Sequence, residues 1–125
     1  MSYQSHGLFK QVCEEFALRL DLSLKELADH LGIDRHTLSN LVKKQTGMSF
    51  RHWSQGQRLD RACRVLLESP TSTIKEVAFS AGYRSPQVFV RAFRRQHEIT
   101  PSAWRDREGP SVRRNAAGLR TTTTT

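Results

Sequence analysis

The sequence predicts an all-α fold of about seven helices, built from two helix-turn-helix units that a long linker helix joins. Three observations lead to this prediction. Apolar residues recur at helical spacing, signals for the start and end of a helix occur in the same order twice, and the two occurrences align as an internal repeat. A chain of 125 residues has room for one compact domain, or for two small ones that share a helix.

The first expected helix is amphipathic and about three turns long. Leu8, Val12, Phe16 and Leu20 are spaced by four residues and therefore share one helical face.

An internal repeat follows this helix. Residues 23–28 (Ser-Leu-Lys-Glu-Leu-Ala) match residues 73–78 (Thr-Ile-Lys-Glu-Val-Ala) at an offset of 50. After one extra residue in the second copy the offset becomes 51, and Trp53 matches Trp104. A single insertion at a turn, with matching residue types on both sides, is typical of two copies of one structural unit.

Each copy begins with a short helix. It is expected to start at a capping box, whose hydroxyl and carboxylate groups satisfy free backbone N–H groups, and to end at a glycine that can adopt a positive φ. The boxes are Ser23 with Glu26 and Thr73 with Glu76, and the glycines are Gly32 and Gly82.

A second helix follows in each copy, so that the pair forms a helix-turn-helix. Asp34 is the expected N-cap in the first copy. Ser85 is the expected N-cap in the second, where Pro86 occupies the first helical position. The inward apolar stripes are Leu38, Leu41 and Val42 in the first copy, and Phe89, Ala92 and Phe93 in the second.

The domain is expected to span residues 4–106 and to be homeodomain-like. Its parts are a first unit at about 8–48, a linker helix at about 49–68 and a second unit at about 73–106; residues 107–125 form a basic, Thr-rich tail expected to be disordered. A linker of this length measures ~30 Å, close to the ~34 Å between successive major-groove faces of B-DNA.

The charge of the chain is uneven and favours a polyanionic partner. The net charge is +8, and because acidic and basic residues balance in residues 1–50, all of the excess lies in residues 51–125. The outward faces of the two second helices carry side chains suited to base edges. The candidate base-reading residues are Arg35, His36, Ser39, Asn40, Gln87, Val90 and Arg91, and the candidate phosphate contacts are Lys43, Lys44, Arg51, Arg84, Arg94, Arg95 and Arg105.

From about Leu8 to Arg105 the chain resembles the AraC/XylS family of bacterial transcription regulators. The matching patterns are Leu24-x-x-Leu27-Ala28-x-x-x-Gly32, Leu38-x-x-Leu41-Val42-Lys43-Lys44-x-x-Gly47-Met48-Ser49-Phe50, Arg58-Leu59-x-x-Ala62, Val77-Ala78-x-x-x-Gly82-Tyr83, Pro86-x-x-Phe89-x-x-x-Phe93-Arg94-Arg95 and Thr100-Pro101-x-x-Trp104-Arg105. The resemblance implies seven helices, with two recognition helices set into adjacent major grooves of double-stranded DNA. If the protein is an activator, RNA polymerase is a further expected partner.

The chain also departs from that family. Asp34-Arg35 stands where many members have Ser-Pro, Ser54 where an apolar residue is common, and Gly56 lies inside the linker helix. Most members carry a separate ligand-sensing domain, for which this chain has no room. The sequence therefore leaves two alternatives, a stand-alone regulator or the DNA-binding part of a longer one.

Other classes of function are weakly supported by the sequence. No nucleophile–base pair, metal motif or phosphate loop is visible, so neither an enzyme nor a cofactor is predicted. Cys13 and Cys63 have apolar neighbours at helical spacing and are expected in the core, with redox sensing as the alternative. Neither a membrane span nor a signal peptide is recognisable, and a cytoplasmic, nucleoid-associated protein is expected. A helical adaptor without specific DNA binding remains the rival interpretation.

Overall fold

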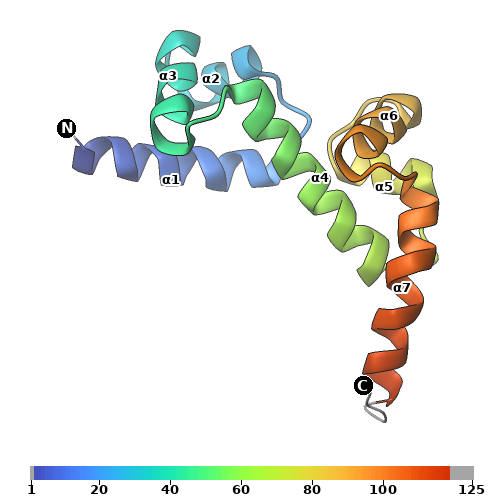
Figure 1. The fold of residues 1–125 in the computed structure, drawn as a ribbon. Helices are drawn as coiled ribbons and strands as arrows, with labels where there is room; N and C mark the ends of the chain where they lie inside the picture. Colours follow the sequence, from blue (N-terminus) through green and yellow to red (C-terminus); the bar gives the residue numbers. More distant parts are fainter. Residues whose placement is uncertain (1, 119–125) are drawn as a thin grey trace. The chain divides into compact units, whose positions relative to one another are not determined.

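The computed structural model describes the backbone of residues 2–118 and the side chains of residues 6–109. The described residues form seven helices and no strand, as the sequence predicts (Figure 1). The helices are α1 (Ser2–Leu18), α2 (Leu24–Leu31), α3 (Arg35–Thr46), α4 (Phe50–Glu68), α5 (Ile74–Ser80), α6 (Pro86–His97) and α7 (Pro101–Gly118). The chain divides into two compact units, Met1–Leu59 and Asp60–Thr125, so that α4 contributes to both.

The predicted capping boxes are present in both units. The hydroxyl of Ser23 accepts from the N–H of Glu26 at 3.1 Å, and the Glu26 carboxylate accepts from the N–H of Ser23 at 2.9 Å. Thr73 and Glu76 make the same pair of bonds at 3.0 and 2.8 Å. Both helix starts are therefore specified by side chains within one turn of the sequence.

The turns between the two helices of each unit begin in the same way, although the second turn is longer. Gly32 and Gly82 have φ angles of 72° and 91°, in the region that glycine adopts without steric cost. The next residue of each copy donates the same backbone hydrogen bond: Ile33 to the Ala28 carbonyl at 3.0 Å, and Tyr83 to the Ala78 carbonyl at 2.9 Å. One expectation is corrected in the second unit, where α5 ends at Ser80 and Gly82 lies in the turn beyond it.

The opening helix also ends earlier than its apolar spacing predicts. Leu20 was expected on the same helical face as Phe16, but α1 ends at Leu18, and the N–H of Arg19 bonds to the Phe16 carbonyl in a tighter turn. Leu20 and Leu22 nevertheless become buried, from the segment that leads into α2. Spacing by four correctly predicted the burial of Leu20 but not its conformation.

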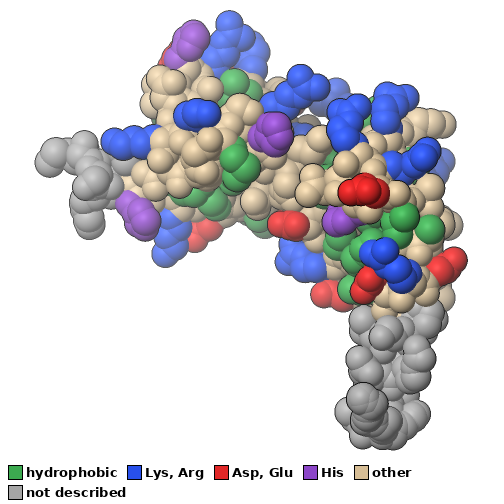
Figure 2. Space-filling model, in the orientation of Figure 1, with side chains coloured by type: hydrophobic (Ala, Val, Ile, Leu, Met, Phe, Trp, Pro, Cys, Tyr) green, Lys and Arg blue, Asp and Glu red, His purple; other side chains and the backbone are tan. Residues whose placement is uncertain are grey.

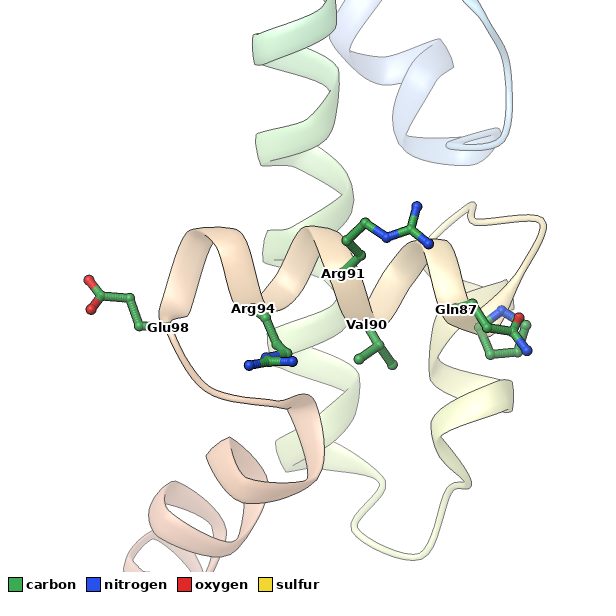
Figure 3. A pocket seen from close by; sticks show the side chains of 6 residues that line it. Gln87, Val90, Arg91, Arg94 and Glu98 are labelled. Carbon is green, nitrogen blue, oxygen red and sulfur yellow. The ribbon is translucent and has the colours of Figure 1, made fainter.

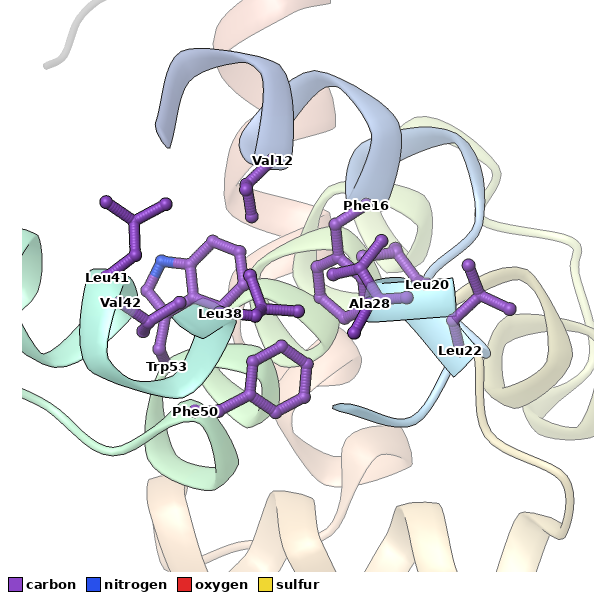
Figure 4. Packing of buried hydrophobic residues seen from close by; sticks show 11 residues of the cluster. Val12, Phe16, Leu20, Leu22, Ala28, Leu38, Leu41, Val42, Phe50 and Trp53 are labelled. Carbon is purple, nitrogen blue, oxygen red and sulfur yellow. The ribbon is translucent and has the colours of Figure 1, made fainter. Parts of the chain in front are cut away.

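The core of the first unit surrounds a group of aromatic rings (Figure 4). Phe16, Phe50 and Trp53 lie with ring centroids 5.3–5.9 Å apart, and Phe9 contacts Trp53 from α1. The predicted stripe of α3, Leu38 with Leu41 and Val42, packs in the same cluster. These contacts fix which side of α3 faces inward.

The core of the second unit is formed by the predicted stripe of α6. Phe89, Ala92 and Phe93 are buried, as the sequence predicts. The Phe89 and Phe93 rings lie 5.8 Å apart, and Phe93 also contacts Trp104 of α7 at 5.8 Å. The orientation of α6 about its axis is therefore set in the same way as that of α3.

One arginine in each unit bonds to the backbone just before the helix-turn-helix. Arg58 donates to the Leu20 and Leu22 carbonyls at 2.6 and 3.1 Å. The guanidinium of Arg105 donates to the carbonyls of Leu66, Ser69 and Ser72 at 3.1, 3.2 and 2.7 Å. Each arginine thus holds the segment that leads into the capping box of its unit.

The last helix extends beyond the expected end of the domain. The polar composition from residue 107 onward predicts a disordered tail, whereas α7 continues to Gly118. Once a helix has started, each further residue other than a proline, such as Pro110, adds its own backbone bond, so a helix can outlast the apolar pattern. Residues 119–125 lie outside the described residues, and the expectation that the segment from residue 107 contributes nothing to stability stays a prediction.

Among residues 2–118, no helix combines the length and the apolar character that a membrane span requires.

The two unusual residues of the linker helix are accommodated in α4. Ser54 is buried, and its hydroxyl donates to the Arg51 carbonyl at 3.2 Å. The helix also runs without interruption through Gly56.

We expect Arg105→Ala to lower the free energy of unfolding by about 2–3 kcal/mol, because three carbonyls lose a charged donor, two of them in partly buried hydrogen bonds. Arg105→Lys should recover little of this loss, because an ammonium group cannot reproduce the planar fork. Urea unfolding followed by Trp fluorescence measures both variants. Arg107→Ala, which removes only an exposed pair with Glu108, is the matched control. Equal stability of Arg105→Ala and Arg107→Ala would contradict the assignment.

We also expect Cys63 to react slowly with alkylating agents. Burial, and secondarily the negative charge of Asp60, raise the pKa of this thiol to about 11. At pH 8 the thiolate should therefore be on the order of 100-fold rarer than for an ordinary thiol. The rate of iodoacetamide labelling, followed by mass spectrometry, should keep rising tenfold per pH unit up to pH ~9.5. A rate that levels off near pH 9 would show an ordinary thiol and reopen the redox alternative.

Candidate nucleic-acid interface

The outward face of α3 carries the first set of predicted site residues. Because Leu38, Leu41 and Val42 face the core, the intervening positions must face away from it. Arg35, His36, Asn40, Lys43 and Lys44 are exposed, and Ser39 is half-buried. The structure therefore brings the predicted α3 residues to one continuous side of this helix.

The outward face of α6 forms a shallow groove. It is lined by Pro86, Gln87, Val90, Arg91, Arg94 and Glu98. Figure 3 shows these side chains projecting from the helix, with Arg91 directed to one side and Val90 and Arg94 to the other. Gln87, Arg91 and Arg94 are exposed and Val90 is half-buried. Four of the predicted residues of this unit thus line one groove.

The start of α6 is fixed by its cap. The Ser85 hydroxyl accepts from the N–H of Val88 at 3.3 Å and lies 2.9 Å from the Gln87 side-chain oxygen. The second contact restricts the Gln87 side chain at the mouth of the groove. Pro86 follows the cap at the first helical position, as predicted.

The groove presents a defined mixture of hydrogen-bonding and apolar groups. Arginine offers a planar pair of donors, glutamine offers a donor beside an acceptor, and valine offers an apolar contact. Within the part of the chain whose side chains are described, Arg91 and Arg94 make no ion pair and so keep their donors available. Figure 2 shows Lys and Arg side chains gathered over α6, which gives this surface a positive potential.

Most of the predicted phosphate contacts are exposed. Lys43, Lys44, Arg51, Arg84, Arg94 and Arg95 all have exposed side chains. Arg105 is different, because its guanidinium is bonded to three backbone carbonyls of its own unit. The guanidinium of Arg105 is therefore engaged within the protein, and its contact with a phosphate stays a prediction.

Two residues of the groove were not among the predicted site residues. The sequence gives Pro86 only a role in starting the helix, and the charge pattern does not single out Glu98. The internal repeat contains the missing signal, since Glu98 stands 51 residues after Gly47, where a second glycine would be expected. Glu98 is thus an acidic residue at a position where the other copy has glycine, and it lies on a basic surface. Aligning the two copies of the repeat detects this difference.

Among residues 6–109, no group of three or more His, Cys, Asp or Glu side chains is arranged to hold a metal ion. The pair formed by Cys63 Sγ and His97 Nε2, 3.7 Å apart, lies beside the aromatic core of the second unit. Both thiols are half-buried, so the cysteines lie at the edge of the core rather than within it as expected.

Comparisons with known proteins agree with this architecture. A family described as "Helix-turn-helix domain" matches residues 27–107. The regulatory protein PocR of Salmonella typhimurium is 33% identical over 85 residues, which cover 68% of this chain and 28% of PocR. The xylose operon regulatory protein of Escherichia coli K12 is 31% identical over 85 residues, 68% of this chain and 21% of the relative. The chain therefore spans less than a third of the length of these relatives.

A solved structure extends the similarity to a complex with DNA. The DNA-binding domain of AdpA, a global transcriptional factor crystallised with a target DNA, superposes with a TM-score of 0.70 and 26% identity. The match covers 90% of this chain and 96% of that domain.

The paired capping boxes, the backbone hydrogen bond that the two turns share, and these matches lead to one conclusion. The chain belongs to the AraC/XylS family of helix-turn-helix transcription regulators and is an AraC-type DNA-binding domain.

Proposed function

We propose that the protein is a sequence-specific transcription regulator that inserts α3 and α6 into two major-groove segments of double-stranded DNA. The observation that carries this proposal is the groove of α6, where Gln87, Val90 and Arg91 stand together, outside the core and on a basic surface. An α-helix with its side chains is about 10–12 Å wide and enters a major groove about 12 Å wide.

In the second unit, Arg91 and Gln87 are the base-reading pair. They are four residues apart and thus one turn apart on the helix. The arginine fork matches the O6 and N7 acceptors of guanine, and the glutamine amide matches the N6 and N7 groups of adenine. Val90 contacts a thymine methyl group. Arg94 lies one turn beyond Val90, where α6 leaves the DNA major groove, and it binds a phosphate.

In the first unit, Asn40 takes the role of Arg91. Both are exposed and lie in the middle of their helices, and an asparagine amide favours adenine. Arg35, His36 and Ser39 occupy the first half of α3, the part of such helices that reaches base edges. Lys43 and Lys44 lie in its last turn and, with Arg51, bind phosphates.

The remaining basic residues position the second unit on DNA. Arg84 precedes α6 and Arg95 lies in its last turn. Both can therefore bind phosphates, one on each side of the DNA major groove. Where the protein acts as an activator, RNA polymerase is the further partner that we propose.

A variant of this function is that the chain acts as the DNA-binding part of a longer regulator. PocR and the xylose operon regulatory protein are longer, and this chain matches only 28% and 21% of them. In that variant, the same two-helix DNA recognition operates as one part of a larger, signal-controlled regulator. The DNA contacts proposed above are the same in both cases.

Footprinting on a site selected from random-sequence DNA tests the proposal. Because one chain carries two reading helices, a monomer should protect two major-groove segments about 10 base pairs apart on a non-palindromic site. Methylation protection of guanine N7 locates the segments, and sedimentation gives the stoichiometry. Protection of a single segment, or a strict requirement for an inverted repeat, would contradict the proposal. An adaptor without specific binding would select no sequence at all.

Arg91→Ala should leave folding intact and weaken binding to the selected site by about 1–3 kcal/mol, with discrimination lost at a single base pair. The reason is that Arg91 is exposed and contributes to no core contact, whereas its fork is the group that distinguishes guanine. Competition against every single-base variant of the site is the measurement. Arg95→Ala is the matched control and should weaken all sequences equally. A uniform loss for Arg91→Ala as well would make Arg91 a phosphate contact.

A further inference from the structure

Glu98 has a backbone conformation that the repeat assigns to glycine. It follows α6 with φ 67° and ψ 6°, while Gly47 follows α3 with φ 77° and ψ 0°. Each donates its N–H to the carbonyl four residues earlier, at 2.7 and 2.8 Å. Glu98 is the one non-glycine residue with positive φ among residues 2–118. Left-handed backbone is unfavourable for a residue with a Cβ, so glutamate is retained here at a cost in stability.

Within the described side chains, Glu98 makes no ion pair that recovers this cost. The side chain is exposed. In Figure 3 its carboxylate points away from the helix, at the opposite end of α6 from Gln87. It also lies at the C-terminal end of a helix, where the helix dipole favours a positive charge and disfavours a negative one.

The position of Glu98 along α6 determines what it meets on DNA. Glu98 is eleven residues beyond Gln87, or ~16 Å along the axis at 1.5 Å per residue. The major groove is about 12 Å wide. With the first half of α6 over the bases, the Glu98 carboxylate therefore reaches the phosphate backbone at the edge of the groove rather than a base.

We propose that Glu98 opposes a DNA phosphate and thereby limits the affinity of the second unit for every DNA sequence. The inference rests on the proposed insertion of α6 into the major groove. Repulsion from one carboxylate offsets part of the attraction from Arg94 and Arg95, so that the basic surface alone holds DNA weakly. Base contacts from α6, together with the first unit, are then needed for a stable complex.

The test measures binding of wild type, Glu98→Gln and Glu98→Gly to the selected site and to an unrelated duplex of equal length. Glutamine keeps the size and the backbone requirement but removes the charge. At low salt, Glu98→Gln should bind both duplexes about 2- to 5-fold more tightly, and the gain should shrink as salt increases. Glu68→Gln is the control, because it removes an exposed carboxylate of the same unit outside the groove and should change binding less.

Glu98→Gly separates the backbone effect from the charge. It should show the same gain in affinity and also raise the Tm by a few degrees, more than Glu98→Gln, which removes only the unfavourable charge at the end of α6. Unchanged affinity of Glu98→Gln for both duplexes, or altered preference at one base pair, would overturn the proposal. Wild-type binding judges the proposed function separately: if the wild type does not prefer the selected site, that function fails whatever Glu98 does.

Discussion

Everything proposed for this protein depends on the burial of one face of α3 and one face of α6. Leu38, Leu41 and Val42 fix α3, and Phe89, Ala92 and Phe93 fix α6. Burial of each large apolar side chain is worth about 1.5–3 kcal/mol. Rotating either helix by a single residue would expose several of them, a loss that no surface ion pair, at about 0–1 kcal/mol, can offset. The outward faces are therefore a consequence of the core, and their residues can change without altering how they are presented.

The sequence predicted the features that depend on local chemistry. Capping boxes and turn glycines act within one turn of the chain, so Ser23, Thr73, Gly32 and Gly82 could be assigned from residue type and spacing alone. Leu20 shows the limit of such reasoning, because a spacing of four fits both a longer helix and a buried residue just beyond a shorter one. The tail shows a second limit: composition predicts whether a segment can form a core, but α7 extends through backbone bonds that need none. Of the candidate site residues, exposure is confirmed for most, while their contacts with DNA stay predictions.

Arg105 shows a third limit, because its structural role could not be foreseen. A basic residue near a basic surface is a candidate phosphate contact on charge alone, and its sequence neighbourhood contains nothing that argues otherwise. Its actual partners are the carbonyls of Leu66, Ser69 and Ser72, which are 33–39 residues away in the chain. Only the packing of α7 against its own unit brings these groups together. Long-range contacts of this kind cannot be inferred from residue type, so the sequence alone could not separate Arg105, which bonds to its own backbone, from the other candidate arginines.

The two arginines that hold the backbone also show how the repeat has diverged. Leu22 and Ser72 immediately precede the N-caps Ser23 and Thr73, and both carbonyls accept from an arginine. By the offset of 51, however, Arg105 corresponds to Ser54 and not to Arg58, so the donor comes from a different position in each unit. The requirement preserved between the copies is therefore the satisfied carbonyl and not a particular side chain. Gly47 and Glu98 show the reverse case, since the backbone conformation is preserved and the residue that suits it is not. Hydrogen bonds and core burial hold the backbone of both units, so the solvent-facing residues can differ between them. One fold repeated in a single chain can therefore present Asn40 in one unit and Arg91 in the other.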